Sequence, residues 1–285
     1  MRWQNRRESS NVEDRRGMSG RKIAAGGGIG GIILIVLYLL LGGNLGDNVP
    51  DLSLSTDSGA PGGENRPLTA EEQTAGKFVS VILADTEDVW NAIFKAQGRT
   101  YVEPKLVLFT DITDSGCGTA QSASGPFYCP GDEKVYIDLG FFAEMQRRLN
   151  APGDFAEAYV IAHEIGHHVQ NQLGIMEKVM SLRNQASERE FNALTVRLEL
   201  QADFLAGVWA HHAQRMQNIL EEGDVEEGIN AAGAVGDDRI QRMTQGYVVP
   251  DAFTHGTSEQ RVRWFLKGFK TGDITQGDTF NADTL

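Results

Sequence analysis

The sequence predicts an α+β domain that is mostly helical, contains a small sheet and is preceded by one transmembrane helix. Three observations lead to this fold class. Apolar residues recur with helical spacing through most of the second half of the chain, two short apolar stretches have the character of strands, and residues 23–41 carry no charge. The chain has 285 residues, so the part beyond residue 66 is long enough to bury one sizeable core.

Residues 1–22 form a basic arm at the N-terminus. They contain seven arginines and lysines against three acidic residues, a net charge of +4, whereas the whole chain carries −13. Basic residues beside an apolar segment favour the cytoplasmic side of a membrane. We therefore expect a cytoplasmic arm, which could also contact anionic lipid or a partner.

The uncharged residues 23–41 predict a single membrane-spanning helix. As a helix the segment is roughly 28 Å long, enough to cross the apolar part of a bilayer. Asn44, Asp47 and Asp51 follow it, so we expect a single-pass protein of the bacterial inner membrane with its domain in the periplasm or outside the cell. A cleaved signal peptide is the alternative, although the apolar stretch is long and no clear Ala-x-Ala site follows it.

Glycines within this segment lie at two overlapping G-x-x-x-G spacings, at Gly26, Gly27, Gly30 and Gly31. Such spacings can pack two transmembrane helices into a homodimer, or they are a glycine-rich lead-in with weak helical character. Residues 42–66 are rich in Gly, Ser, Asp, Asn and Pro, which is typical of a flexible linker. Residues 67–285 then form the extracytoplasmic domain.

Local patterns divide this domain into elements. A helix is predicted from about residue 68 to residue 98, followed by a buried strand at 106–109 and an alternating strand at 134–139. Further helices are predicted at 154–173, 196–205 and 237–245, and a last one begins near residue 260.

Cys117 and Cys129 are the only cysteines of the chain. Outside the cytoplasm we expect them to form a disulfide, which contributes on the order of 2–3 kcal/mol in the chain-entropy model. Two zinc thiolates are the alternative, but the spacing does not fit a zinc knuckle. The disulfide and the charge pattern both indicate an extracytoplasmic domain.

The central motif is His163-Glu164-x-x-His167 within the helix predicted at 154–173. On a helix, residues i and i+4 project from one face, so both imidazoles can bind one zinc ion. Glu164 lies beside that ion as a candidate general base. The alternative is a helix whose histidines are merely buried or exposed.

Glu199 and Asp203 share one face of the next helix, among apolar neighbours. Zinc with two histidines requires a third protein ligand and one open position, and Glu199 is the candidate. Asp203, one turn later, can accept the outer N–H of His163 and fix its orientation. We therefore expect one Zn²⁺ per chain, while a solvated acidic face is the ordinary interpretation of such a pair.

The two motifs together resemble the gluzincin metallopeptidases. The segment from Thr254 to Val262, with His255 and Arg261, is similar to a His-Pro-x-x-x-x-Arg stretch of HtpX-like membrane peptidases, with Gly256 in place of proline. The chain most resembles the bacterial putative neutral zinc metallopeptidase family of single-pass membrane proteins. The likeness covers residues 116–131, the zinc motif, the Glu199 helix and the His255 segment.

This resemblance implies a zincin-like fold with a cleft between a strand-bearing half and a helical half. It also implies that His255 and Arg261 stabilise the oxyanion, whereas the residues alone favour a helix cap at His255 and an ion pair between Arg261 and a carboxylate. By the same resemblance, residues 134–139 are the edge strand that binds substrate through Val135, Tyr136 and Ile137; an ordinary sheet strand has equal weight.

We therefore expect a membrane-anchored zinc metallopeptidase, an endopeptidase, that acts on peptides or proteins. The alternative is a membrane-tethered binding or scaffold protein in which zinc is structural. An acidic run at residues 221–238 is typical of a solvated surface, and no basic patch indicates nucleic acid.

Overall fold

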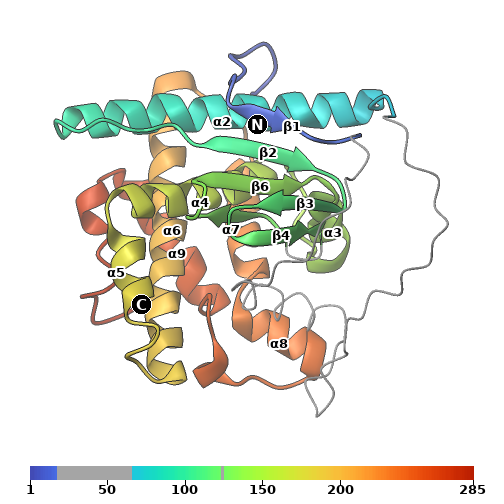
Figure 1. Ribbon diagram of the computed structural model, residues 1–285. Helices are drawn as coiled ribbons and strands as arrows, with labels where there is room; N and C mark the ends of the chain where they lie inside the picture. The colour runs from blue at the N-terminus through green and yellow to red at the C-terminus, as the bar shows by residue number, and fades with distance from the viewer. Residues whose placement is uncertain (18–65, 123–124) are drawn as a thin grey trace.

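The computed structural model describes residues 1–17, 66–122 and 125–285 (Figure 1). The helices are α2 (Ala70–Ala96), α3 (Gly140–Leu149), α4 (Asp154–Gln172), α5 (Ile175–Ser181), α6 (Glu188–Gln217), α7 (Asp224–Ala234), α8 (Asp237–Gln245) and α9 (Ser258–Thr271), with short 3₁₀ turns η2 (Pro250–Ala252) and η3 (Ile274–Gln276). The strands are β1 (Val12–Asp14), β2 (Lys105–Phe109), β3 (Ile112–Ser115), β4 (Gly118–Gln121), β5 (Phe127–Cys129) and β6 (Lys134–Asp138). This mostly helical domain with a small sheet confirms the predicted α+β class.

Helix α2 lies along one side of the sheet (Figure 1). Its first residues contain a motif that fixes where the helix begins. Thr69 and Glu72 form a capping box, in which each side chain bonds the other residue's backbone N–H. Most residues between Phe78 and Phe94 are buried, so the helix is held by packing along its length. It confirms the helix predicted at 68–98.

The main sheet has the strand order β1-β2-β6-β5. β1, β2 and β6 are parallel, and β5 runs antiparallel to β6. β6 is therefore an interior strand: Val135 is paired with Leu106 on one side and with Tyr128 on the other. This corrects the prediction that 134–139, with Tyr136 and Ile137, is the edge strand, because β5 covers the free edge.

The N-terminal arm is part of this folded body. β1 pairs with β2, placing Val12 opposite Leu106, and the backbone N–H of Ser9 donates to the carbonyl of Ser80 at 3.0 Å. In Figure 1, β1 lies beside α2 at the top of the sheet. The prediction of an arm separated from the domain is thus corrected for residues 1–17, because the sheet supplies the hydrogen-bond partners that an isolated basic segment lacks.

Several predictions concern residues that the structure leaves undescribed. The transmembrane helix at 23–41, its glycine spacings and residues 42–65 of the linker all lie outside the described residues. Within the described ranges, no helix combines the length and the apolar character needed to cross a membrane.

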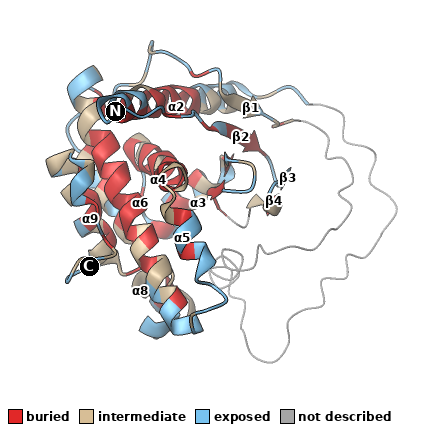
Figure 2. Cartoon of the chain, turned by 60° about the vertical axis from the view of Figure 1, so that its left-hand side comes forward, coloured by how far each residue is buried: buried red, intermediate tan, exposed pale blue. Residues whose placement is uncertain are grey.

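Helices α4 and α6 form the centre of the helical half; α4 is buried over most of its length, and α6 is continuously buried from Leu200 to Ala210 (Figure 2). Gly166 of α4 faces the backbone of α6 at Ala202. A Cβ on this glycine would lie 3.0 Å from the Ala202 carbonyl oxygen and 3.2 Å from its Cα. The missing side chain therefore lets the two helices approach closely, directly beside the histidines of α4.

Candidate metal centre

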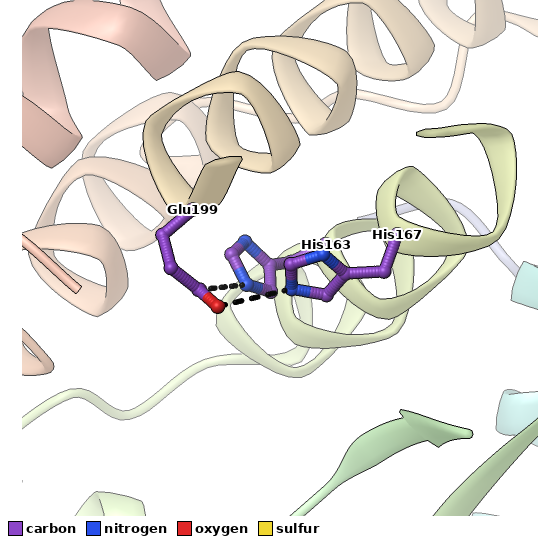
Figure 3. Close-up of side chains that lie close together, drawn as sticks. All are labelled: His163, His167 and Glu199. Atoms are coloured by element: carbon purple, nitrogen blue, oxygen red, sulfur yellow. Dashed lines mark hydrogen bonds and ion pairs between the residues drawn. The ribbon is translucent and has the colours of Figure 1, made fainter. Parts of the chain in front are cut away.

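Two histidines of α4 and one glutamate of α6 converge on a single point (Figure 3). The Nε2 atom of His163 lies 3.2 Å from Oε2 of Glu199, and Nε2 of His167 lies 3.5 Å from Oε1 of the same carboxylate. Nitrogen and oxygen ligands about 2.0–2.2 Å from a tetrahedral zinc ion are separated by roughly 3.3–3.5 Å. The three residues predicted as ligands therefore have the spacing that zinc requires.

Asp203 holds the outer nitrogen of His163, as predicted. Its Oδ1 lies 2.9 Å from Nδ1 of His163, which leaves Nε2 free as a ligand. The same carboxylate accepts the hydroxyl of Tyr159 and two N–H groups of Arg261, at 2.8 and 2.9 Å. Asp203 is fully buried and Arg261 is 3% exposed, so His163 is oriented by a closed network of charged groups.

His167 is oriented by a residue that the sequence did not single out. The Oε1 atom of Gln170 lies 2.9 Å from Nδ1 of His167, and the amide of Gln170 donates to the carbonyl of Leu198 at 2.7 Å and to Gln201 at 3.1 Å. Gln170 is fully buried. A buried glutamine three residues after a ligand, on the same helix face, was the available signal for this role.

The centre attracts a cation. Burial alone would raise the pKa of Asp203, but Arg261 and His163 outweigh it and lower this pKa to about 2. Burial would lower the pKa of His163, yet Asp203 and Glu199 raise it to about 10. The two carboxylates therefore hold a positive charge between them, and a metal ion can take the place of the proton.

One side of the centre opens into a cleft of about 260 Å³. Glu164 lines the cleft beside the two histidines. Within the described part of the chain, the group at this point holds three protein donors, His163, His167 and Glu199. Three donors and an open side are the arrangement of catalytic zinc sites, whereas structural sites have four protein ligands.

His255 lines the same cleft, and the side of its ring that carries Nδ1 contacts Asp237. The Nδ1 atom of His255 lies 3.2 Å from Oδ1 of Asp237. Oδ2 of Asp237 accepts the backbone N–H groups of Thr254, His255 and Gly256 at 2.7, 2.6 and 3.0 Å. Asp237 was seen in the sequence only as one of several acids in a surface run, but it organises the loop that carries His255.

Arg261 occupies a different place from His255. Its guanidinium bonds Asp203 and donates to the carbonyl of Val235 at 3.2 Å. These contacts correspond to the alternative that the sequence left open, an ion pair with a carboxylate. Arg261 therefore lies behind His163, although part of it also lines the cleft.

The opposite wall of the cleft includes β5 and the residues just before it. Phe127 and Tyr128 line the cleft, and a disulfide joins Cys117 to Cys129 at the end of β5, which confirms the predicted pairing. His168, next to a ligand but on another helix face, lies 3.1 Å from the Tyr128 hydroxyl. Burial lowers the pKa of His168, so a neutral imidazole connects the metal helix to this edge strand.

Known proteins resemble this chain over most of its length. The family described as putative neutral zinc metallopeptidase matches residues 1–280. The uncharacterized protein YpfJ of Escherichia coli (strain K12) is 52% identical over 289 residues, covering 98% of this chain and 99% of its own length. The uncharacterized protein Rv2575 of Mycobacterium tuberculosis is 40% identical over 221 residues, covering 74% of each. No solved structure matched significantly.

Proposed function

Because the chain belongs to the putative neutral zinc metallopeptidase family, we propose that it is a zinc-dependent endopeptidase that hydrolyses peptide bonds in the cleft beside His163 and His167. One observation carries this proposal. The two imidazoles and the Glu199 carboxylate meet with zinc-compatible spacing on the wall of a cleft, so the ion would keep a position open toward substrate.

The reaction would need a base, and Glu164 is the candidate. Zinc, when bound, supplies a Lewis acid that acidifies water and polarises a carbonyl. Glu164 lies on the next helical position after His163 and lines the cleft. Its carboxylate would take the proton of the attacking water and deliver it to the leaving amine. Asp203 and Gln170 would meanwhile keep both ligand imidazoles in place.

His255 is the candidate for stabilising the oxyanion. It reaches the cleft from the loop before α9, and Asp237 holds its Nδ1 side, which leaves Nε2 for the substrate. Asp237 would thus position His255, as Asp203 positions His163. Arg261 is proposed to act through Asp203 rather than on substrate, because its N–H groups already have buried partners.

An extended peptide is the substrate that fits the cleft. β5 is an edge strand of the sheet and lies on the cleft wall, so its free backbone groups could pair with a substrate strand. The walls also carry the apolar side chains Phe141, Met176, Leu198 and Ile240. We therefore propose cleavage next to large apolar residues.

The test uses the full chain, because the arm is part of the folded domain. Zinc content is measured together with cleavage of casein by the wild type and by Glu164→Gln. We expect one zinc per chain in both proteins and a loss of cleavage of about 10²–10⁴-fold in the variant. Equal activity in the variant would remove Glu164 from the mechanism. Bound zinc without cleavage by either protein would favour the binding or scaffold function.

Attachment to a membrane through residues 23–41 remains a proposal from the sequence. It is supported by 19 uncharged residues next to a basic segment. Separation of cells into soluble and membrane fractions, with and without residues 18–65, would test it. Recovery of the complete chain in the soluble fraction would contradict it.

A further inference from the structure

A row of buried amide hydrogen bonds joins the ligand His167 to the η3 segment, residues 274–282. Gln170 lies 2.9 Å from Nδ1 of His167 and donates to Oε1 of Gln201 at 3.1 Å. The amide nitrogen of Gln201 donates in turn to the backbone carbonyl of Gly277 at 2.8 Å. Gln170 is fully buried and Gln201 is 8% exposed. These two glutamines and the Gly277 carbonyl, the amide row, therefore extend the metal centre beyond α4.

The amide row has one direction. His167 offers Nε2 to the metal, so its Nδ1 carries the proton and donates to Oε1 of Gln170. The NH₂ group of Gln170 must then find acceptors, which are the Leu198 carbonyl and Oε1 of Gln201. This orientation turns the NH₂ group of Gln201 toward the Gly277 carbonyl. A reversed Gln201 would set donor against donor and oxygen against oxygen, which is costly for buried amides.

Helix α6 turns opposite faces to the two ends of the amide row. Glu199 and Asp203 face the histidines of α4. Arg197 and Gln201 lie roughly 200° around the helix from these acids and face the η3 segment. Arg197 donates to the carbonyl of Thr279, and the hydroxyl of Thr279, which is fully buried, donates back to the Arg197 carbonyl at 2.6 Å. The backbone beside Gly277 is therefore anchored to α6.

Gly277 reaches Gln201 because it has no side chain. A Cβ at this position would lie 2.5 Å and 2.6 Å from two ring carbons of Phe204, which is fully buried. The φ of Gly277 is −88°, a value that any residue adopts, so the close approach to Phe204 is what requires glycine. A larger residue would have to move the carbonyl that Gln201 contacts.

We propose that Gln201, oriented by the carbonyl of Gly277, is a positioning residue of the metal centre. It holds Gln170 in the one orientation in which His167 presents Nε2 to zinc. The inference rests on the metal centre of the proposed function and deepens it. Zinc affinity should therefore depend on a contact with the η3 segment, on the face of α6 that is turned away from the cleft.

The experiment measures zinc affinity and the thermal midpoint of the full chain, the first by competition with a chromogenic chelator. We expect Gln201→Met to lower zinc affinity about 3–10-fold. The loss should be smaller than in Gln170→Met, because the Leu198 carbonyl still holds Gln170. In a Gln170→Met background, Gln201→Met should change the affinity by less than about twofold, since the amide row is already broken.

Gln214→Met is the matched control, on the same helix. The amide of Gln214 bonds the side chain of Asn218 and the backbone N–H of Leu220, outside the amide row. This substitution also removes two hydrogen bonds and is expected to lower the thermal midpoint, but it should leave zinc affinity within about twofold of the wild type. A role of Gln201 in stability alone would make Gln201→Met behave in the same way.

Gly277→Ala tests the other end of the amide row. It should lower zinc affinity about 3–10-fold and add less than about twofold to the loss in Gln170→Met. This pair replaces the first if Gln201→Met does not fold. Losses that multiply in the Gln170→Met background would overturn the proposal, as would unchanged affinity in Gln201→Met or Gly277→Ala.

The same measurements separate this proposal from the proposed function. A wild type that binds no zinc would reject the metal centre, and the role of Gln201 with it. A wild type that binds zinc, with multiplying losses in the double variants, would reject the role of Gln201 alone. Zinc binding that follows the expected pattern without cleavage of casein would support the role of Gln201 and reject the peptidase.

Discussion

Two groups of acids lie along α4, and they are compensated in different ways. Near the middle of the helix, Asp203 of the neighbouring helix α6 is fully buried. It bonds both His163 and Arg261, and Arg261 is 3% exposed. At the start of the helix, the side chain of Asp154 is 37% exposed, and its partner belongs to the N-terminal arm. The middle group is closed on all sides, whereas the first group is partly open to water.

This difference in burial predicts that the two groups differ in how strongly they depend on their partners. A buried charge that loses its partner cannot regain it from water, while a partly exposed carboxylate can be hydrated. The metal centre should therefore respond strongly to single substitutions and the arm only weakly. The following variants test that ranking.

Asp203→Ala should have the largest effect. It leaves the Arg261 guanidinium buried without its anion, so we expect a loss of about 3–5 kcal/mol in the free energy of unfolding. Urea denaturation measures it. Asp251→Ala is the matched control, because its pair with Arg189 is exposed on both sides, and it should change stability by less than about 0.5 kcal/mol. A loss below about 1 kcal/mol in Asp203→Ala would refute the ranking.

Arg261→Lys keeps the charge but loses the two-point contact with Asp203. We expect a loss of about 1–3 kcal/mol in stability. If Arg261 acts only through Asp203, kcat with saturating zinc should fall less than tenfold. A kcat loss of about 10²–10³-fold with little change in stability would instead assign Arg261 to the oxyanion. Arg263→Lys, at an exposed pair with Glu259, is the control.

Gln170→Met removes the group that orients His167 while keeping the side-chain volume similar. We expect zinc affinity to fall by about 10–100-fold, because the imidazole loses its fixed orientation. Competition with a chromogenic chelator measures this affinity. Gln185→Met, at an exposed position, should bind zinc like the wild type; an unchanged affinity in Gln170→Met would show that the ligand geometry is held by packing alone.

Arg6→Ala should have the smallest effect, and one that depends on pH. Burial, opposed by Arg6, raises the pKa of Asp85 to about 7 in the folded protein. Below that pH Asp85 is neutral with or without Arg6, so the variant should lose less than about 1 kcal/mol at pH 6. Without Arg6 the pKa rises further, so ionised Asp85 loses its partner as pH increases.

Unfolding free energies at pH 6 and pH 8.5 provide the measurement for Arg6→Ala. The difference from wild type should grow to about 1–2 kcal/mol at the higher pH. Arg2→Ala, whose ion pair with Glu221 is half-exposed at 3.7 Å, should show no such growth. A difference that shrank with pH would contradict the assignment of Asp85 as the group that titrates.

The sequence correctly predicted the features that depend on short spacings between residues. His163, His167, Glu199 and Asp203 lie at helical intervals, and such intervals carry over directly into three dimensions. The order of strands in a sheet cannot be deduced from spacing in this way. β5 has only three residues, and its pairing with β6 is what shows which strand is the edge. For that reason the prediction that residues 134–139 form an edge strand was wrong.

The arm could not be predicted for a related reason. Its composition is basic and polar, which is typical of an unfolded segment, and its partners lie more than 70 residues away. Arg6 and Arg7 meet Asp85 and Glu87 on α2, where the sequence showed only an ordinary amphipathic helix. Charge complementarity between distant segments leaves no periodic signal.

The docking of the N-terminal arm also sets an order on biosynthesis. The arm is synthesised long before its partners, since the backbone N–H of Arg2 donates to the carbonyl of Ile219. At 5–20 residues per second, roughly ten to forty seconds separate the arm from its partners. A nascent chain that stopped before Ile219 could not dock Arg2, so the docked arm marks a chain whose translation has passed the metal-binding helices.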